Sequence, residues 1–412
     1  MKPTLLKPTL LKLVRLKLVL LSSASDSWPV VKCLSCLPLL AALAFGSRPV
    51  DAWQDSADLQ QAITAVRDVG AGGQGHARAV AAIKVLNQAD STQVLQLLEG
   101  MDGANPLAAN WLRGAIQSAL DGQAAVPLEG IREYLTDRTR SDEGRLLAWE
   151  LVENHQPEWA ARQLPQMLDD PCLPLRRRAV DWHVDQAAQP EQVNKALSLL
   201  GYALTHARDV DQIREIAGKL GEQGLHVDLQ KQLGVVNQWY VTGPFDNRGE
   251  KGFDTICGPE TDPGNIDFES GYTDTRDDQP AVWQKHSTLD PTGVVNLNDL
   301  LGNLKGATAY AATEFESGED QAVEIRIGCI NANKVWVNGE EVINNEIYHV
   351  GMMPDQFLGK ARLKKGTNTI LFKVCQNEQE QAWAQDWMFQ LRICQPDGSA
   401  VQPAPSRAAP GE

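Results

Sequence analysis

Amides, carboxylates and aromatic side chains stand close together near the C-terminal end of the chain. The run Gln376–Gln379 (QNEQ) follows an apolar, strand-like segment, and Trp383 and Trp387 come soon after it. Amides and carboxylates hydrogen-bond to hydroxyl groups, and aromatic rings stack on the apolar faces of sugars. The combination predicts a glycan-binding surface that includes Asn377, Glu378, Trp383 and Trp387. The alternative is that both indole rings pack in the protein core or against the helical repeats, since large aromatic side chains are commonly buried.

Two further groups of residues have the chemistry to serve a ligand. Tyr348 and His349 fall in the loop that should follow a β-hairpin, and we expect them to join the same surface. Asp246, Asn247 and Asp254 place oxygen atoms around glycine-containing turns, and calcium prefers oxygen ligands. These three residues are therefore candidate calcium ligands. The alternative is that their side chains simply cap the turns, as Asp and Asn commonly do.

Motifs of common enzymes are absent from the sequence. It contains no phosphate-binding loop, no dinucleotide-binding glycine pattern, no nucleophile elbow and no H-E-x-x-H zinc motif. Carboxylates are numerous, but the sequence does not tell whether two of them lie at the separation of a glycosidase pair. We therefore expect a protein that is not an enzyme and has no cofactor.

The C-terminal part, residues 236–396, carries the pattern of an antiparallel β-sandwich. Asn338-Gly339 lies between two short alternating runs, and this dipeptide is typical of a two-residue hairpin turn. Strand-like runs occur at residues 238–247, 281–284, 309–315, 322–329, 334–337, 341–343, 368–375 and 388–393. Many short strands separated by turn signals predict a sandwich or jelly roll. Residues 255–280 are expected to form a long loop, and residues 397–412 a disordered tail.

Residues 53–235 show the periodicity of helices. Apolar residues recur at spacings of three and four, and prolines precede several of these runs, where they suit the first helical turn. Arg145 aligns with Arg178, and Trp149 with Trp182, at an offset of 33 residues. One helical hairpin cannot bury its apolar face alone, so such a repeat predicts an α-solenoid of stacked hairpins. An irregular helical bundle is the alternative.

The block from Ala322 to Val374 resembles the galactose-binding-like jelly roll that accompanies β-galactosidases and β-glucuronidases. In that family a strand similar to Val323–Ile327 leads into a hairpin similar to Val335–Val342, and a strand similar to Leu363–Val374 follows. The resemblance implies a β-sandwich scaffold. It does not imply hydrolysis, because the sequence contains no glycosidase catalytic domain.

A second resemblance covers more of the chain. The sequence from Trp53 onward is similar to a group of uncharacterised secreted bacterial proteins that join HEAT-like helical repeats to such a jelly-roll domain. The phrases Trp239–Asn247 and Lys373–Gln379 are typical of that group. This resemblance implies the order of the two domains and brings no established activity.

The first 52 residues have the features of a signal region. Leu34–Phe45 is an apolar run of signal-peptide length and is too short to span a bilayer. Residues 50–52 (VDA) fit a small-residue cleavage site, which predicts cleavage before Trp53 and an extracytoplasmic location. The repetitive stretch Met1–Leu21 leads to the hypothesis that translation starts later. The alternative is an uncleaved membrane anchor, whereas cleavage would leave no stable membrane span.

The net charge bears on the class of binding partner, and the cysteines bear on possible disulfides. The formal net charge is −15, and no long basic run follows the signal region, so a nucleic-acid partner is not expected. Five cysteines remain after the signal region: Cys172, Cys257, Cys329, Cys375 and Cys394. They either form one or two disulfides in an oxidising compartment or serve as small buried apolar residues.

These observations favour a secreted, non-catalytic binding protein. The β-sandwich would recognise a glycan or a cell-envelope partner, and the helical repeats would offer a surface for binding another protein. One alternative is a structural or assembly protein of the envelope that binds no small ligand. Another is an unrecognised carbohydrate-active enzyme.

Overall fold

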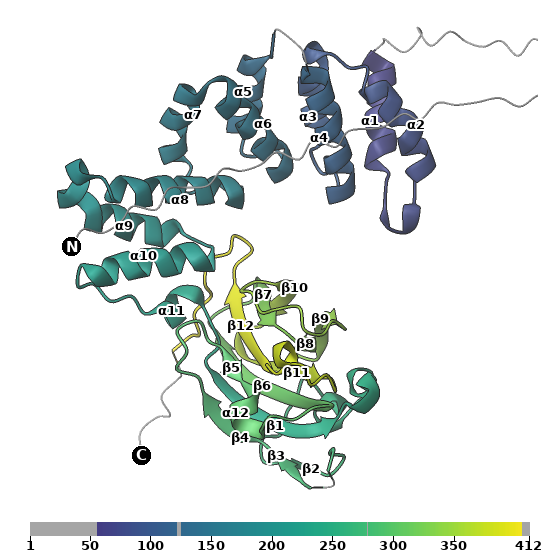
Figure 1. Ribbon diagram of the computed structural model, residues 1–412, viewed down its shortest axis with the longest axis vertical. Coiled ribbons are helices and arrows are strands. Elements are labelled where there is room, and N and C mark those ends of the chain that lie inside the picture. The colour runs from purple at the N-terminus through teal and green to yellow at the C-terminus, as the bar shows by residue number, and fades with distance from the viewer. Residues whose placement is uncertain (1–55, 122–124, 278, 406–412) are drawn as a thin grey trace, which may run out of the picture. The chain divides into compact units, whose positions relative to one another are not determined.

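The computed structural model describes residues 56–121, 125–277 and 279–405 (Figure 1). The predicted signal region and its cleavage site lie outside these residues. Helices occupy the N-terminal part of the described chain, and antiparallel β-sheets occupy the C-terminal part. The last helix of the N-terminal part ends at Leu233, and the first strand begins at Gln238. No helix in the described residues is long and apolar enough to cross a membrane.

The N-terminal part consists of helices, and several of them begin with a side-chain cap or with a proline in the first turn. Asn105 accepts a hydrogen bond from the Ala108 amide at 3.0 Å, and Pro106 follows as the first helical residue. The helices are α1 (Ser56–Arg67), α2 (His76–Leu86), α3 (Val94–Gly100), α4 (Pro106–Leu120), α5 (Leu128–Thr136), α6 (Asp142–His155), α7 (Pro157–Gln163), α8 (Leu173–Ala187), α9 (Ala196–His206), α10 (Val210–Glu222) and α11 (Leu229–Leu233). Neighbouring helices pack in pairs, such as α1 with α2, α5 with α6 and α8 with α9 (Figure 1).

The repeat seen in the sequence aligns α6 with α8, but the aligned side chains differ in environment. Trp149 and Arg145 on α6 are fully buried. Trp182 and Arg178 on α8 are only half-buried. The two helices therefore share a pattern of residue types without sharing the same packing.

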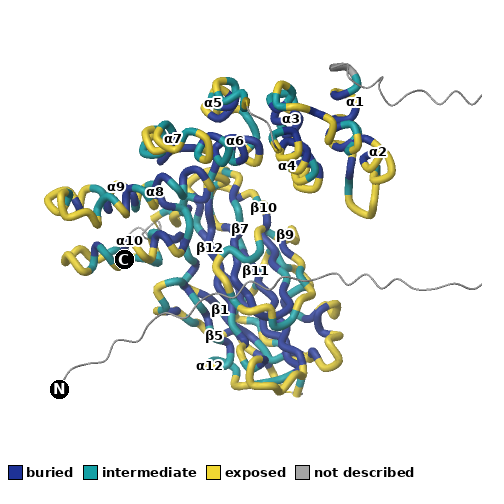
Figure 2. Tube along the Cα trace, turned by 45° about the horizontal axis from the view of Figure 1, so that its top comes forward, coloured by how far each residue is buried: buried dark blue, intermediate teal, exposed yellow. Residues whose placement is uncertain are grey.

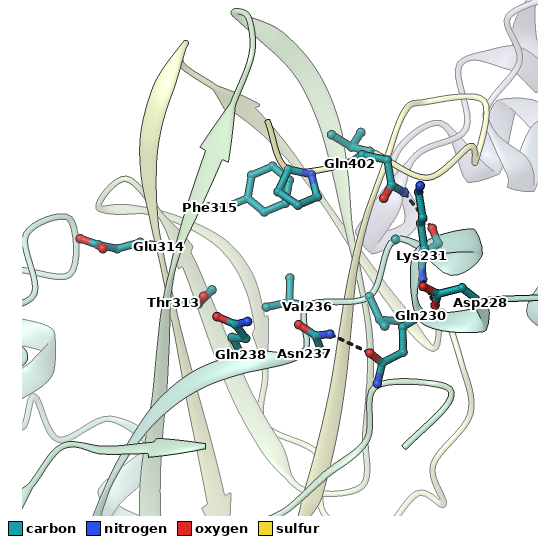
Figure 3. A pocket seen from close by; sticks show the side chains of 14 residues that line it. Asp228, Gln230, Lys231, Val236, Asn237, Gln238, Thr313, Glu314, Phe315 and Gln402 are labelled. Carbon is teal, nitrogen blue, oxygen red and sulfur yellow. Dashed lines mark hydrogen bonds between the residues drawn. The ribbon is translucent and has the colours of Figure 1, made fainter. Parts of the chain in front are cut away.

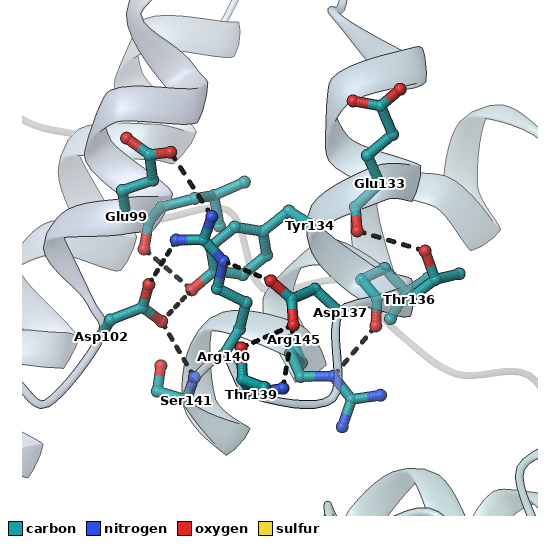
Figure 4. Close-up of polar contacts among 12 residues, drawn as sticks. Glu99, Asp102, Glu133, Tyr134, Thr136, Asp137, Thr139, Arg140, Ser141 and Arg145 are labelled. Atoms are coloured by element: carbon teal, nitrogen blue, oxygen red, sulfur yellow. Dashed lines mark hydrogen bonds and ion pairs between the residues drawn. The ribbon is translucent and has the colours of Figure 1, made fainter.

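Polar side chains join successive helix pairs. Asp102, in the loop after α3, accepts hydrogen bonds from the Tyr134 hydroxyl at 2.7 Å and the Ser141 amide at 2.9 Å (Figure 4). Arg140 adds an ion pair to Asp102 at 2.9 Å. Further along the chain, Arg145 and Asp170 form a buried pair of the same kind. These contacts fix neighbouring parts of the helical array to one another by directional bonds as well as by apolar packing.

The C-terminal part contains three antiparallel sheets. The six-stranded sheet has the order β4-β1-β6-β11-β8-β9, the four-stranded sheet has the order β10-β7-β12-β5, and a two-stranded sheet pairs β2 with β3. The strands are β1 (Gln238–Asp246), β2 (Gly271–Tyr272), β3 (Ala281–Val282), β4 (Gln284–Ser287), β5 (Val295–Asn296), β6 (Ala307–Ser317), β7 (Gln321–Cys329), β8 (Ala332–Val337), β9 (Glu340–Asn345), β10 (Phe357–Leu363), β11 (Gly366–Gln376) and β12 (Met388–Cys394). One short helix, α12 (Leu297–Leu301), follows β5.

The two larger sheets bury one apolar core between their side chains. Phe372 of β11 contacts Phe389 of β12 with ring centroids 4.6 Å apart, and Trp239 of β1 contacts Phe389 at 5.1 Å. Strands β7, β11 and β12 are buried along most of their length (Figure 2). The predicted hairpin between β8 and β9 is confirmed, since φ is 52° at Asn338 and 87° at Gly339.

The other face of the six-stranded sheet is also covered. The segment expected to be a long loop packs on it, with Phe268 stacked on Tyr240 at a ring distance of 3.9 Å. Below this segment Lys373 is fully buried, and its ammonium group donates to Glu260 at 2.6 Å and to the carbonyl oxygen of Phe253 at 3.0 Å. Residues 255–280 therefore contribute a second, smaller core.

The expectation of a disordered tail is wrong for residues 397–405. Val401 is 5% exposed and joins the core between the sheets. Asp397 lies near Arg176 and Arg208, with nitrogen–oxygen distances of 3.4 Å and 3.5 Å. The Ala404 amide donates to the carbonyl oxygen of Glu316 on β6. The proline- and alanine-rich composition suggested disorder, but buried Val401 and the ion pairs of Asp397 hold this segment against the fold. Residues 406–412 lie outside the described part.

All five cysteines of the described residues are buried free thiols. Burial raises the pKa of Cys329 and Cys375 to about 12, so both thiols stay protonated at neutral pH. Of the two alternatives drawn from the sequence, buried apolar packing is the one that the structure has.

Candidate ligand-binding site

The polar side chains predicted to bind a ligand meet where β11 ends. Asn377 follows the last residue of β11 and is 4% exposed. Its side-chain oxygen lies 2.7 Å from His349 Nε2, and its amide nitrogen donates to Glu250 Oε1 at 3.0 Å. The Asn377 amide is thus held between two loops that are far apart in the sequence.

Both loops hold a non-glycine residue in a strained backbone conformation beside Asn377. The φ angle is 59° at Glu250 and 57° at His349. A left-handed conformation of this kind costs a non-glycine residue about 1–3 kcal/mol and is concentrated at functional sites. The hydrogen bonds to Asn377 help to hold both residues in place. Two such residues are hydrogen-bonded to the side chain of Asn377. We therefore take the region around the end of β11, which we call the rim, as the leading candidate site.

An open hollow of about 650 Å³ lies at this rim. It is lined by Gly249, Glu250 and residues 377–381. The backbone amide of Gly249 donates to Glu378 Oε2 at 2.8 Å, which ties the two sides of the hollow together. The polar lining offers carboxylate and amide groups for hydrogen bonds.

Aromatic side chains lie near Asn377, although none of them lines the hollow itself. Trp383, in the short 3-10 helix Ala382–Ala384, is 62% exposed and meets the His349 ring edge-to-face at 5.3 Å. The half-buried Tyr348 accepts a hydrogen bond from Asn247 Nδ2 at 3.3 Å. Burial raises the pKa of the Tyr348 hydroxyl, so it remains protonated. The structure therefore brings Asn377, Glu378, Tyr348, His349 and Trp383 into one region.

Trp387 does not belong to this surface, and its prediction as a ligand-binding residue is wrong. Its side chain is fully buried in the core between the sheets, and its Nε1 donates to the carbonyl oxygen of Val374 at 3.3 Å. Trp387 directly precedes β12, and the burial of that strand carries the ring inward. Trp383, four residues earlier, lies in the exposed turn.

The three candidate calcium ligands have different surroundings. Asp246 forms an ion pair with Arg248 at 2.7 Å, and the Asp254 side chain is 85% exposed, 3.7 Å from Lys334. Asn247 is fully buried and donates to the carbonyl oxygen of Gln376 at 3.0 Å. Among the described residues, no group of three or more His, Cys, Asp or Glu side chains is arranged to hold a metal ion. The calcium site stays a prediction without a contact that supports it.

A second hollow, of about 310 Å³, lies between α11, the first residues of β1, β6 and the C-terminal segment (Figure 3). Val236, Phe315 and Val401 give it an apolar base, whereas Gln402 and Glu314 are polar groups on its lining. The Gln402 side chain is already engaged, because its amide donates to the carbonyl oxygen of Lys231 at 2.7 Å. The hollow is smaller than the rim site and has no exposed aromatic ring.

Sequence reasoning missed several residues that line the hollow, namely Gly249, Glu250, Glu380 and Gln381. Glu250 and Gly249 belong to the 3-10 segment Arg248–Phe253, which the sequence marked only as a turn. The signal that could have found them is the pairing of Asn247 and Gly249 in one short turn. Nothing in the sequence shows that this turn folds across to Asn377.

No protein-family model matches the chain, and no curated protein matches it significantly. Solved structures do resemble parts of it. A family 35 carbohydrate-binding module from Clostridium thermocellum is 15% identical, with a TM-score of 0.17, and 26% of this chain covers 99% of the module. A β-glucuronidase from Ruminococcus gnavus is 12% identical, with a TM-score of 0.24, over 39% of this chain and 29% of the enzyme.

A β-glucosidase from Kluyveromyces marxianus is similar at 13% identity and a TM-score of 0.21, over 27% of this chain. This chain spans only 14% of the length of that enzyme. The neighbours thus include carbohydrate-binding and glycosidase β-sandwich folds. At these identities and TM-scores they carry no argument about the site, which depends on its own geometry.

Proposed function

We propose that this chain is an extracytoplasmic, non-catalytic binding protein that recognises a glycan at the rim hollow beside Trp383. The observation that carries this proposal is the Asn377 amide, held between the strained residues Glu250 and His349 at the edge of that hollow. Strained, hydrogen-bonded loops keep the polar groups fixed before a ligand arrives, which lowers the entropic cost of binding.

The chemistry of the rim supports a sugar ligand. Amide and carboxylate groups face the hollow, and they can donate and accept the hydrogen bonds that sugar hydroxyls require. Trp383 is 62% exposed and contacts His349, which is hydrogen-bonded to Asn377, and an indole face can stack on the apolar face of a sugar ring. Trp387, by contrast, is fully buried and cannot contact a ligand.

The same geometry favours binding over hydrolysis. Glu250 and Glu378 are both exposed. A glycosidase keeps its general acid protonated near neutral pH by surrounding it with apolar groups or by placing a like charge close to it. Neither glutamate is surrounded by apolar groups, so we assign both to ligand recognition. A carbohydrate-active enzyme remains the alternative outcome of the experiments below.

The finer architecture is part of the proposal. We propose that the helices form a HEAT-like α-solenoid that offers a protein-binding surface, and that the sheets form a galactose-binding-like jelly roll. The apolar core shared by the two larger sheets and the pairing of neighbouring helices support these assignments. An envelope protein is the partner that an extracytoplasmic location would make available.

Glycan-array binding followed by calorimetry tests the function. The wild-type protein should bind at least one glycan, and Trp383→Ala should weaken that binding about tenfold or more while the protein stays folded. Tyr202→Ala is the matched control, since Tyr202 is an aromatic residue 54% exposed on α9. Equal loss in both variants would contradict the assignment of the site.

Two other results would favour the alternatives. An array without binding, together with stoichiometric recovery of an identified envelope protein, would favour a structural or assembly role. Turnover of a polysaccharide that disappears in Glu250→Gln would show an enzyme.

A further inference from the structure

A lysine and a glutamate meet in the interior of the β part, away from the rim hollow. Lys373 belongs to β11 and its side chain is 0% exposed, while Glu260, whose Oε1 lies 2.6 Å from Lys373 Nζ, has a side chain 7% exposed. The carbonyl oxygens of Phe253 and Thr255 accept the other hydrogen bonds of this Nζ, at 3.0 Å and 2.9 Å. A nucleophilic amine and a carboxyl group are thus in contact where bulk water has little access.

The contacts of Lys373 Nζ give the amine a fixed orientation. A neutral lysine amine carries two N–H groups and one lone pair. When the two N–H groups donate to the carbonyl oxygens of Phe253 and Thr255, the lone pair is left facing Glu260. Reacting groups held in a productive geometry reach effective molarities of about 10⁵–10⁸ M. The fold therefore holds this pair in a position suited to condensation.

An uncharged product would suit this interior better than two charged groups. The sheet register places Lys334 of β8 directly opposite Lys373. Like charges directly opposite each other on neighbouring strands are destabilising, and an ion pair in the interior carries the desolvation of both its members. An amide carries no charge, so its formation removes the repulsion from Lys334 and the burial of two ions.

Tyr310 is placed to assist the reaction. It lies opposite Lys373 on β6, is fully buried, and donates its hydroxyl hydrogen to Glu260 Oε1. Burial raises the pKa of this hydroxyl, so it stays protonated and remains a donor. A donor at a carboxyl oxygen stabilises the negative charge that develops there when a nucleophile attacks.

We infer that Lys373 and Glu260 condense to an amide, which forms an isopeptide cross-link between β11 and the segment that covers its outer face. One proton moves from Lys373 Nζ to the Glu260 carboxylate, and the freed lone pair attacks the carboxyl carbon. The new C–N bond forms as one C–O bond breaks. The departing oxygen leaves as water with a second proton from Nζ, passed through the Tyr310 hydroxyl. The reaction consumes no oxidant or other co-reactant.

The cross-link would supply a covalent tie that the cysteines do not provide. All five cysteines of the described residues are free thiols. The amide would join residues 113 positions apart, and closing a loop of that length restricts the unfolded chain. This inference is independent of the proposed glycan binding, because neither Lys373 nor Glu260 lines the rim hollow.

Mass spectrometry of the denatured full chain tests the inference. After correction for the substitution, the wild type should be lighter than Lys373→Met by the mass of one water molecule. The comparison cancels any processing of the N-terminus and does not require the variant to fold. A tryptic digest of the wild type should contain a branched peptide that joins Lys373 to Glu260. Lys334 and Asp254, 3.7 Å apart with the Asp254 side chain 85% exposed, are the internal control and should stay unlinked.

Tyr310→Phe should slow formation of the cross-link about tenfold or more, measured as the linked fraction against time after refolding. An equal rate would overturn the role given to Tyr310. A folded wild type of full mass, without the branched peptide after prolonged incubation at neutral pH, would overturn the inference and leave a structural ion pair. Linkage that forms equally in urea, or that also joins Lys334 to Asp254, would overturn it too, because the folded geometry would not be its cause.

Discussion

Removal of Asp170 should unfold the helical part far more readily than removal of an equivalent carboxylate at the surface. Asp170 receives two hydrogen bonds from the Arg145 guanidinium, at 2.6 Å and 2.7 Å, and one from the Cys172 amide at 2.9 Å. The side chains of Arg145 and Asp170 are 1% and 2% exposed. Asp170→Ala would leave a guanidinium charge buried without its counter-ion.

The magnitude follows from that burial. Removing one partner of a buried ion pair costs about 3–5 kcal/mol, because the remaining charge is desolvated and unpaired. Arg145 would keep only the hydrogen bond from its Nε to the carbonyl oxygen of Leu135. The chain offers a matched comparison in Asp211, which receives hydrogen bonds from Arg177 at 2.8 Å and 2.6 Å. Those two side chains are 68% and 38% exposed, so Asp211→Ala should cost no more than about 1 kcal/mol.

Urea unfolding followed by circular dichroism at the helical band measures both variants against the wild type. A double variant, Arg145→Leu with Asp170→Leu, should recover part of the lost stability because no buried charge remains. Recovery should be incomplete, since the Cys172 amide loses its acceptor. Equal losses in the free energy of unfolding for Asp170→Ala and Asp211→Ala would refute the reasoning. Burial would then have no influence on how much an Arg–Asp ion pair stabilises the protein.

Three other predictions concern the β part. Trp387→Ala should cost about 3–5 kcal/mol and Trp383→Ala less than about 0.5 kcal/mol, as measured by urea unfolding followed by tryptophan fluorescence. Equal costs would contradict their opposite burial. Asn338→Ala should cost about 1–2 kcal/mol, because φ is 52° there and its side chain bonds to Asn368 and the Thr369 amide. An unchanged urea midpoint would contradict this. The pKa of Asp397 is lowered to about 2 by its hydrogen bonds to Ser399 and by nearby arginines, against 3.8 for an unperturbed Asp. Its stabilising contribution should be present above about pH 4 and lost as the pH falls toward 2, a dependence that Asp397→Asn should reduce in acid titrations.

The sequence predicted the elements whose local signals agree with their final environment. The turn at Asn338-Gly339 needs positive φ at both residues, and few other dipeptides provide it. Strand β10 was not predicted from the sequence, because its apolar residues do not alternate with the side of the strand that is buried. Leu358 is exposed, whereas Gly359 is buried so that its backbone can approach Val342, whose carbonyl oxygen would lie 2.5 Å from an added Cβ. Here close backbone contact outweighs the alternation of apolar side chains.

The sequence predicted which residue types gather at the site, but it did not predict how those residues are arranged in space. Residue types alone selected Asn377, His349 and Trp383, because polar groups at a strand end next to an aromatic ring are a local pattern. The opposite burial of Trp383 and Trp387 depends on where β12 begins and on which sheet covers it. The contact between Asn377 and Glu250 joins residues that are far apart in the sequence, and no local signal specifies it.

The rim site gains its rigidity from the sheet rather than from its own loops. The Asn377 carbonyl oxygen accepts a hydrogen bond from the Gly306 amide, and Gly306 in turn accepts one from the Asn247 amide. This backbone chain connects the ends of β11 and β1 through the residue that precedes β6. The strained conformations of Glu250 and His349 are therefore attached to buried strands, which can hold them without help from a ligand. The second carboxylate oxygens of Glu250 and Glu378 and the exposed ring of Trp383 are not needed to stabilise the fold. In the proposed function, these groups are therefore available to contact a ligand.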